Sequence, residues 1–295
     1  MQYFTGIDIG STSIKIAIVD GSGDLVTKIT TPTGSQFAKN AVDALNKILS
    51  NAGISPEDNV YTITTGYGRK LYKAGDEAVN EITANAIGVQ ALGSKYAGIR
   101  TIINIGGQDS KVIRLKPDRN VDKFAMNDKC AAGTGRFLEI AARNLEVDIG
   151  EFAELHLNSA ELPCQVNSTC AVFAESELIS LLAMGNDKAA IAGGVHESIA
   201  RRISRLAARV GITEEVLFDG GAAINSGMAQ ALEDELMIPL VIAEDPQVTT
   251  ALGAAELARR KHSHQDIPVN FTTNEINNSR IAVEEKIQSC ESGCG

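Results

Sequence analysis

IDIGSTSIKI, residues Ile7–Ile16, returns later in the chain as INIGGQDSKV, residues Ile103–Val112. Each copy has a short apolar strand, a small polar turn containing glycine, and a second strand. The positions that match at one constant offset are Ile7 and Ile103, Ile9 and Ile105, Gly10 and Gly106, and Lys15 and Lys111. Two such units, a domain-length apart, predict a duplicated α/β fold.

The composition excludes several classes of partner. The 295 residues are 44% hydrophobic and 22% charged, which predicts a globular protein with an ample core. The net charge of −10, with no basic run, argues against nucleic-acid and membrane partners. No apolar run of about 18 residues occurs, and MQYFTGIDIG lacks the charged-then-apolar pattern expected of a signal peptide. We therefore expect a cytoplasmic protein whose five cysteines are free thiols or metal ligands.

Hydrophobic periodicity places the regular elements along the chain. The first strands are expected to form a hairpin meander, and EEVLFDGGAAINSGMAQALEDEL at Glu214–Leu236 reads as strand, turn and helix. We expect a strand near Val60–Thr65 and helices near Ser35–Ala52, Glu77–Leu92, Thr134–Leu145, Ala174–Ala183, Lys188–Val210 and Val248–Arg260. After Lys261 the sequence becomes polar and aperiodic, which predicts a largely disordered tail.

The two glycine turns have the features of a phosphate site. Gly10, and Gly106 with Gly107, let the backbone approach a phosphate whose oxygens consecutive N–H groups can bind. A third segment, FDGGAA, offers Gly220 and Gly221 where a purine and its ribose can pass close to the backbone. The candidate nucleotide ligands here are Asp8, Gly10, Ser11, Thr12, Lys15, Gly106, Gly107, Gln108, Asp109, Gly220 and Gly221.

Asp8 and Asp109 stand at the two hairpins and are suited to hold a hydrated Mg²⁺ from opposite walls of a cleft. Any one glycine turn is equally well a tight hairpin, but three in this order favour a nucleotide site. The chain has neither a P-loop motif nor a dinucleotide-binding fingerprint after a strand.

Five segments carry a family resemblance: GIDIGSTSIK, NIGGQDSK, MNDKCAAGTGRFLE, CAVFAESELISLLAMG and FDGGAAIN. Across about Tyr3–Arg260 the chain resembles the activator ATPases of 2-hydroxyacyl-CoA dehydratases and the related subunits of benzoyl-CoA reductase, within the actin–Hsp70–sugar-kinase superfamily. The resemblance implies two ribonuclease-H-like halves that close on ATP or ADP with Mg²⁺. The implied units are a first half at 1–98, a second half with the cluster cysteines at 99–247, a helix returning to the first half at 248–261, and a tail at 262–295.

Cys130 and Cys170 each come just before a predicted helix, where the helix dipole and free N–H groups stabilise a thiolate or an anionic cluster. Two thiolates are too few for an iron–sulfur cluster with four cysteine ligands, but a twofold dimer doubles them. The residues alone leave open two buried apolar cysteines or a zinc site, although the C-x₂-C pairs usual for zinc are absent. The resemblance implies one [4Fe–4S] cluster held between two subunits by Cys130 and Cys170.

The remaining cysteines and histidines are expected to have other roles. We expect Cys164 to be structural, and Cys290 with Cys294 to be a free pair in the tail. The histidines show no ligand spacing with the cysteines and are assigned no chemistry; they are His156, His196, His262 and His264.

The resemblance implies an ATP-dependent reductive activator that receives an electron from a ferredoxin or flavodoxin. It would pass the electron to an iron–sulfur dehydratase or reductase. Gln108 and Asp109 are the candidates for orienting the hydrolytic water. Gly133, Thr134, Gly135 and Arg136 are expected to sense the phosphates. A sugar-type kinase of the same superfamily, without a cluster, is the alternative that remains open.

Overall fold

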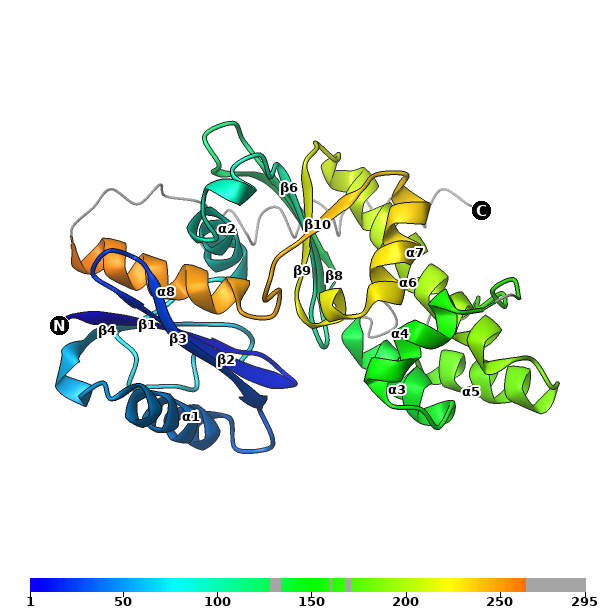
Figure 1. The fold of residues 1–295 in the computed structure, drawn as a ribbon, viewed down its shortest axis with the longest axis horizontal. Coiled ribbons are helices and arrows are strands. Elements are labelled where there is room, and N and C mark those ends of the chain that lie inside the picture. Colours follow the sequence, from blue (N-terminus) through cyan, green and yellow to red (C-terminus); the bar gives the residue numbers. More distant parts are fainter. Residues whose placement is uncertain (128–133, 160, 168–170, 264–295) are drawn as a thin grey trace, which may run out of the picture.

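The structure is a computed structural model that describes residues 1–127, 134–159, 161–167 and 171–263. Two five-stranded sheets lie side by side, and helices cover both faces of each (Figure 1). The strands are β1 Tyr3–Ile9, β2 Ser13–Asp20, β3 Leu25–Pro32, β4 Asn59–Thr65, β5 Glu77–Ala78, β6 Thr101–Ile105, β7 Ser110–Leu115, β8 Val121–Asn127, β9 Val216–Asp219 and β10 Leu240–Ile242. The helices are α1 Phe37–Ala52, α2 Glu81–Ala91, α3 Gly135–Asn144, α4 Ile149–Leu157, α5 Ala171–Ala183, α6 Lys188–Val210, α7 Ser226–Leu236 and α8 Thr249–His262, with short 3₁₀ turns η1 Pro56–Asp58, η2 Ser94–Tyr96 and η4 Gly221–Ile224.

The two sheets have the same topology. Their strand orders are β3-β2-β1-β4-β5 and β8-β7-β6-β9-β10, and in each the first three strands form an antiparallel meander. The fourth and fifth strands of each sheet run parallel to the central strand. The sequence repeat therefore corresponds to a structural repeat, and the predicted duplicated ribonuclease-H-like fold is confirmed.

Alternation along β1 and β2 builds two cores around the first sheet. Ile14, Ile16 and Ile18 face α1 together with Ile7 and Ile9. The other face of the sheet, which carries Ala17 and Val19, packs against α2 and α8. In this half, α1 ends at Gly53, whose φ of 66° makes the left-handed C-cap that the glycine predicts.

Helix α2 lies between the two sheets, which explains why it has no polar face. Ala84 and Ile87 pack in the core under the first sheet. Ile82, Ala86 and Val89 pack against the second sheet. Helix α8 crosses α2 so closely that a Cβ on Gly253 would lie 1.7 Å from the Ala84 carbonyl oxygen. The two halves are thus joined by closely packed backbone.

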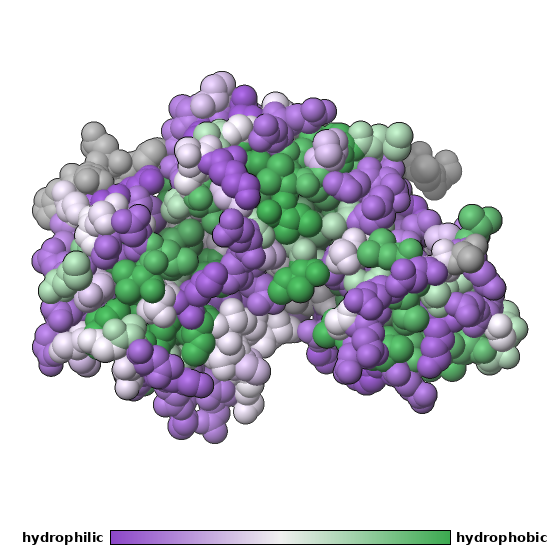
Figure 2. All heavy atoms as spheres, viewed as in Figure 1, coloured by the Kyte–Doolittle hydropathy of each residue, from purple (hydrophilic) through white to green (hydrophobic). Residues whose placement is uncertain are grey.

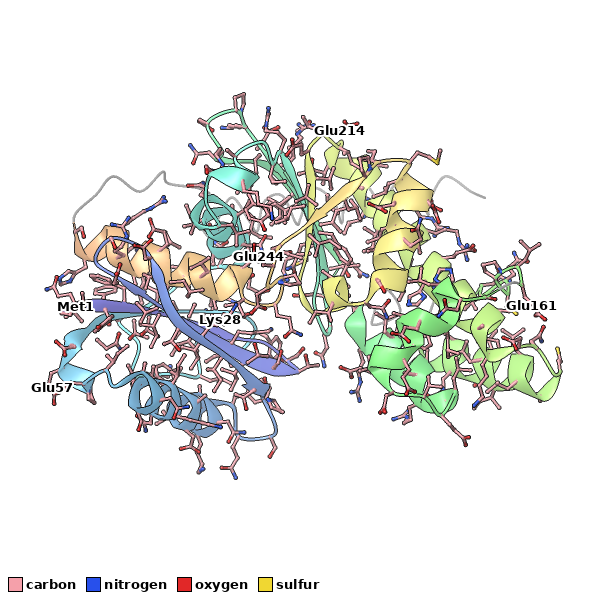
Figure 3. All side chains as sticks on the ribbon, in the orientation of Figure 1. Met1, Lys28, Glu57, Glu161, Glu214 and Glu244 are labelled. Carbon is pink, nitrogen blue, oxygen red and sulfur yellow. The ribbon has the colours of Figure 1, made fainter. Side chains whose placement is uncertain are left out.

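The second sheet is covered on its other face by a larger helical layer. Helices α6 and α7 pack against β-sheet residues such as Ile103 and Phe218. Helices α3, α4 and α5 form a lobe beyond them, and in the space-filling view the surface is indented between this lobe and the first half (Figure 2). Lys28 of β3 also forms an ion pair with Asp245 at 2.7 Å, which joins the two halves; Figure 3 labels Lys28 and Glu244, the residue before Asp245, near the middle of the view.

Several element boundaries differ from those expected. The helix expected from Glu77 begins at Glu81, because Glu77 and Ala78 pair with β4 as the short strand β5. The helix expected from Ala174 begins at Ala171, and α4 was not expected at all. Within the described residues, no helix combines the length and the apolar character that a membrane crossing needs.

Candidate active site

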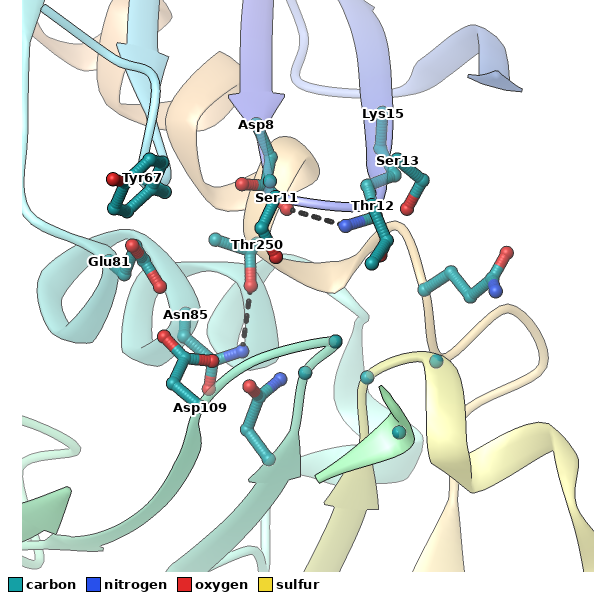
Figure 4. A pocket seen from close by; sticks show the side chains of 18 of the residues that line it. Asp8, Ser11, Thr12, Ser13, Lys15, Tyr67, Glu81, Asn85, Asp109 and Thr250 are labelled. Atoms are coloured by element: carbon teal, nitrogen blue, oxygen red, sulfur yellow. Dashed lines mark hydrogen bonds and ion pairs between the residues drawn. The ribbon is translucent and has the colours of Figure 1, made fainter. Parts of the chain in front are cut away.

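A cleft of about 1460 Å³ opens between the two halves, at the ends of β1 and β6 (Figure 4). The structure brings most of the predicted nucleotide ligands to it, namely Asp8, Gly10, Ser11, Thr12, Lys15, Gly106, Gly107, Gln108, Asp109, Gly135, Gly220 and Gly221. Thr134 and Arg136 do not line the cleft, and Gly133 lies outside the described residues.

The two glycine turns face each other across the cleft. The Gly10 N–H donates to the Ser13 carbonyl at 3.0 Å, and the Gly106 N–H donates to the Asp109 carbonyl at 2.9 Å. Their tips approach closely, since a Cβ on Gly107 would lie 2.6 Å from the side chain of Thr12. The backbone of both halves can therefore reach one small anionic group between them.

Each wall carries a lysine paired with a carboxylate. Lys15 Nζ lies 3.2 Å from Asp8 Oδ2 in the first half (Figure 4). Lys111 Nζ lies 2.8 Å from Asp109 Oδ1 and 2.8 Å from Glu81 Oε2, so it joins the second hairpin to α2. Glu81 was not predicted as a site residue, because nothing in its local sequence indicates that Lys111 lies beside it.

Burial and charge act in opposite directions on these groups. Burial raises the pKa of Asp109, and the nearby Lys111 ammonium offsets only part of this effect. Burial also acts to raise the pKa of Glu81, but Lys111 outweighs it and the pKa is lowered. Burial would lower the pKa of Lys111, but both carboxylates outweigh it and its pKa is raised. Lys111 is therefore charged, and it holds the two carboxylates together at the cleft wall.

A buried polar network lies at the floor of the cleft. Asp219 Oδ1 accepts a hydrogen bond from Asn104 Nδ2, and Asp219 Oδ2 accepts one from Asn85 Nδ2, both at 2.7 Å. Asn85 Nδ2 also donates to Thr250 Oγ1 at 3.0 Å (Figure 4). Burial raises the pKa of Asp219 to about 6, and the two amide donors act against this rise. Sequence reasoning missed this network because its members come from α2, β6, β9 and α8.

The FDGGAA turn forms one side of the cleft. Gly220 has a φ of 87°, and a Cβ there would lie 2.5 Å from the Ile105 carbonyl oxygen, so this position requires glycine. Among the described residues apart from its chain neighbours, a Cβ on Gly221 would meet only Gln247 Nε2, at 3.6 Å, so there is room beside this glycine. Ile149 and Ala153 of α4 line the cleft as well, beside Ile224. This side offers an apolar slot next to exposed backbone, which is suited to a purine.

The N-terminus of α3 is attached to the second glycine turn. The Gly135 N–H donates to the Gly106 carbonyl at 2.8 Å, and the Arg136 N–H donates to the Gly107 carbonyl at 3.0 Å. The Thr134 hydroxyl donates to the same Gly107 carbonyl at 3.1 Å. These groups contact the turn itself, so a displacement of the turn would be transmitted directly to α3.

The described residues include only part of the predicted cysteine chemistry. Cys130, Cys170, Cys290, Cys294 and His264 lie outside the described residues. Cys164 is a free thiol whose pKa is raised by burial, and its Sγ lies 3.7 Å from Asn186 Oδ1. Among the described residues, no three His, Cys, Asp or Glu side chains lie close enough together to hold a metal.

Two histidines that the sequence did not connect are neighbours. His196 of α6 is fully buried, and its Nδ1 lies 3.1 Å from Nδ1 of His156 on α4. Burial and the second imidazole lower the pKa of His196 to about 3, so it is neutral near pH 7. The pair joins α4 to α6 within the helical layer.

Known proteins are similar to this chain over most of its length. The activator of lactoyl-CoA dehydratase from Anaerotignum propionicum is 43% identical over 266 residues, which are 88% of this chain and 100% of the relative. The crystal structure of (R)-2-hydroxyglutaryl-CoA dehydratase component A from Acidaminococcus fermentans is 39% identical, with a TM-score of 0.83 over 89% of this chain and 100% of that chain.

The activator of 2-hydroxyisocaproyl-CoA dehydratase from Clostridium difficile, solved with bound ADPNP, is 38% identical, with a TM-score of 0.82 over 92% of this chain and 100% of that chain. The family model described as BadF/BadG/BcrA/BcrD ATPase matches residues 5–258. The family resemblance predicted from the sequence is confirmed, and this chain belongs to the BadF/BadG/BcrA/BcrD ATPase family.

Proposed function

We propose that this protein is an ATP-dependent reductive activator. It uses ATP binding and hydrolysis to drive single-electron transfer to a partner iron–sulfur enzyme, a 2-hydroxyacyl-CoA dehydratase or a related reductase. The observation that carries the proposal is the attachment of α3, which follows Cys130 in the sequence, to the glycine turn of the nucleotide cleft. The relatives named as dehydratase activators support the same activity.

Asp8 and Asp109 fit the requirements for Mg²⁺. Mg²⁺ in nucleotide sites commonly takes one or two carboxylates, several waters and phosphate oxygens, so it does not need a cluster of three protein ligands. Asp8 and Asp109 stand on opposite walls of the cleft, and the metal would neutralise phosphate charge there. Lys15 and Lys111 hold these carboxylates in place on the cleft walls.

The residues around the glycine turns are proposed to bind the triphosphate. N–H groups and hydroxyls of residues 10–12 would contact it from the first half, and those of residues 106–108 would contact it from the second. Gln108 is exposed in its turn and Asp109 is paired with Lys111, and both are candidates for orienting the attacking water. Gly221 would lie beside the nucleoside.

Cys130 and Cys170 are proposed to hold one [4Fe–4S] cluster between two copies of the chain, which would supply one-electron transfer. The sequence places them shortly before α3 and α5, and these helices pack together through an Arg143–Glu175 ion pair at 3.0 Å. A ferredoxin or flavodoxin is the proposed electron donor. Closure on ATP would displace α3 through the turn at Gly106 and Gly107.

The test is the metal content and mass of protein purified without oxygen. We expect a brown, oxygen-sensitive homodimer with about four iron atoms and four sulfides per two chains. Cys130→Ala and Cys170→Ala should each abolish the cluster, whereas Cys164→Ala, a matched control six residues before Cys170 in the sequence, should keep it. A colourless, iron-free monomer that phosphorylates a sugar would refute the proposal in favour of the kinase alternative.

A further inference from the structure

Equivalent strand positions at the cleft carry different side chains in the two halves. Asp8 of β1 lies opposite Lys15 of β2 in the first hairpin. In the second hairpin, Asn104 of β6 lies opposite Lys111 of β7. The second half therefore has a carboxamide on its central strand where the first half has a carboxylate.

The second half has a carboxylate on the strand next to the central one, β9, instead of on the central strand itself. Thr65 of β4 is in register with Asp8. Asp219 of β9 is in register with Asn104. Asp219 is fully buried and does not line the cleft, whereas Asn104 lines it. Any effect of the Asp219 charge on a ligand in the cleft must therefore pass through a neighbouring side chain.

The hydrogen bonds fix how the Asn104 carboxamide is turned. Both oxygens of Asp219 accept hydrogen bonds at 2.7 Å, one from the Asn104 amide and one from the Asn85 amide, which is the arrangement of a carboxylate that only accepts. Asn104 must consequently direct its NH₂ toward Asp219, at 2.7 Å, and its carboxamide oxygen away from it. Within the described residues, the Asn104 oxygen has no hydrogen-bond partner. It is an acceptor held at the cleft floor and available to a ligand or water.

We propose that Asn104 orients the water that attacks the γ-phosphate of ATP, and that Asp219 is the positioning residue that holds the Asn104 oxygen toward the cleft. In this step the water oxygen forms a bond to the γ-phosphorus, and the bond to the β,γ-bridging oxygen breaks. The electron pair of that bond leaves on ADP, and the proton of the water goes to the phosphate product. The inference rests on the ATPase activity of the family and is independent of electron transfer.

The position of Asn104 suits this task better than the neighbouring turn does. Asn104 is fixed between β7 and β9 in the sheet, and its side chain is held by a second residue. Gln108 is exposed at the tip of the turn, and Asp109 is already engaged by Lys111. An amide oxygen accepts a hydrogen bond from water without taking its proton, as the water-positioning glutamine of other phosphoryl-transfer enzymes does.

The experiment compares steady-state ATP hydrolysis by the full-length wild-type protein and four variants, with MgATP as the substrate. Asn104→Ala removes the oxygen. Asp219→Asn replaces two accepting oxygens with one. In a single orientation the new carboxamide can accept from the Asn104 amide or from the Asn85 amide, but not from both. In the double variant Asn104→Asp with Asp219→Asn, the carboxylate and the carboxamide exchange places. Both hydrogen bonds can form again, and the carboxylate then lies on the central strand, as in the first half. Asp122→Asn, outside the cleft, is the matched control for the loss of a carboxylate in the second half.

We expect Asn104→Ala and Asp219→Asn each to lower kcat on the order of 100-fold, with KM for MgATP within about threefold of the wild type. The double variant should recover kcat to within about tenfold of the wild type, and Asp122→Asn should leave kcat unchanged. Thermal melting and binding of a non-hydrolysable ATP analogue are measured on every variant, to separate the loss of kcat from loss of the fold.

Wild-type kcat in Asn104→Ala would overturn the inference, whatever happens to the Asp219 variants. The inference would also be overturned if the double variant melts at the wild-type temperature and binds the analogue but hydrolyses ATP as slowly as Asp219→Asn. Asp219 would then have only a structural role. Either result leaves the proposed electron transfer untouched. Conversely, an iron-free wild type that hydrolyses ATP through Asn104 would refute only the proposed function.

Discussion

At the scale of single residues, the cleft is organised by lysines that hold carboxylates on its walls. Lys111 is buried and keeps Asp109 and Glu81 together across the two halves. Lys15, which is more exposed than Lys111, is paired with Asp8 in the first half. If Asp8 and Asp109 hold the metal as proposed, a metal-bound triphosphate entering between the walls would meet two carboxylates whose positions are already set, which would reduce the reorganisation needed for hydrolysis.

We predict that Asp8→Ala and Asp109→Ala each lower ATP turnover by about 100-fold or more while keeping the fold. Both carboxylates face the cleft and not the apolar core, and Lys111 retains Glu81 when Asp109 is removed. Phosphate release measures the turnover, and circular dichroism melting measures the fold. Asp43→Ala removes an exposed carboxylate of α1 and is the control. Unchanged turnover in both cleft variants would place the metal elsewhere.

At the scale of elements, the crossing of α2 and α8 sets the geometry of the cleft floor. Both helices carry glycines at the crossing, because a Cβ on Gly88 would lie 1.9 Å from the Thr249 carbonyl oxygen and one on Gly253 would lie 1.7 Å from that of Ala84. This approach brings Asn85 of α2 within 3.0 Å of Thr250 of α8. The floor of the cleft therefore depends on two glycines that do not line it.

We predict that Gly253→Ala destabilises the protein by about 3 kcal/mol or more, because the methyl group meets helix backbone that cannot yield without separating α2 from α8. Gly21→Ala is the control, since a Cβ at Gly21 meets nothing within 4 Å. Urea unfolding of both variants gives the comparison. A Gly253→Ala protein with the wild-type midpoint and slope would mean that the helices cross at a larger distance.

At the scale of the whole molecule, the lobe of α3, α4 and α5 is tied to the nucleotide cleft through the turn at Gly106 and Gly107. Movement of the second hairpin toward a bound nucleotide would therefore displace the start of α3. ATP can bias such a movement only by binding the closed arrangement more tightly than the open one.

We predict that iron is chelated from the reduced protein at different rates in the ADP-bound and ADPNP-bound states, as linkage between two sites requires. Thr134→Val removes the hydroxyl bonded to the Gly107 carbonyl and should reduce this difference. Chelator absorbance against time measures the rates. Equal rates in both nucleotide states of the wild type would show that the nucleotide and the cluster are uncoupled.

The sequence by itself determined the fold class and the glycine turns that line the cleft. The repeat from Ile7 and Ile103 encodes two copies of one hairpin, and the strand alternation and glycine turns that it predicts are local properties. Residues of these turns, such as Gly10 and Gly106, could accordingly be placed at the cleft before the structure. The register of each hairpin follows from the same local pattern.

Only the tertiary structure decided which side chains act together. Glu81 meets Lys111, Asn104 meets Asp219 and His156 meets His196, and each pair joins elements that are distant in the sequence. Even the start of α2 depended on β4, because Glu77 and Ala78 pair with that strand instead of extending the helix. The physical reason is that periodicity records which face of an element is buried, whereas a buried charge or amide is positioned by the particular partner that folding brings beside it.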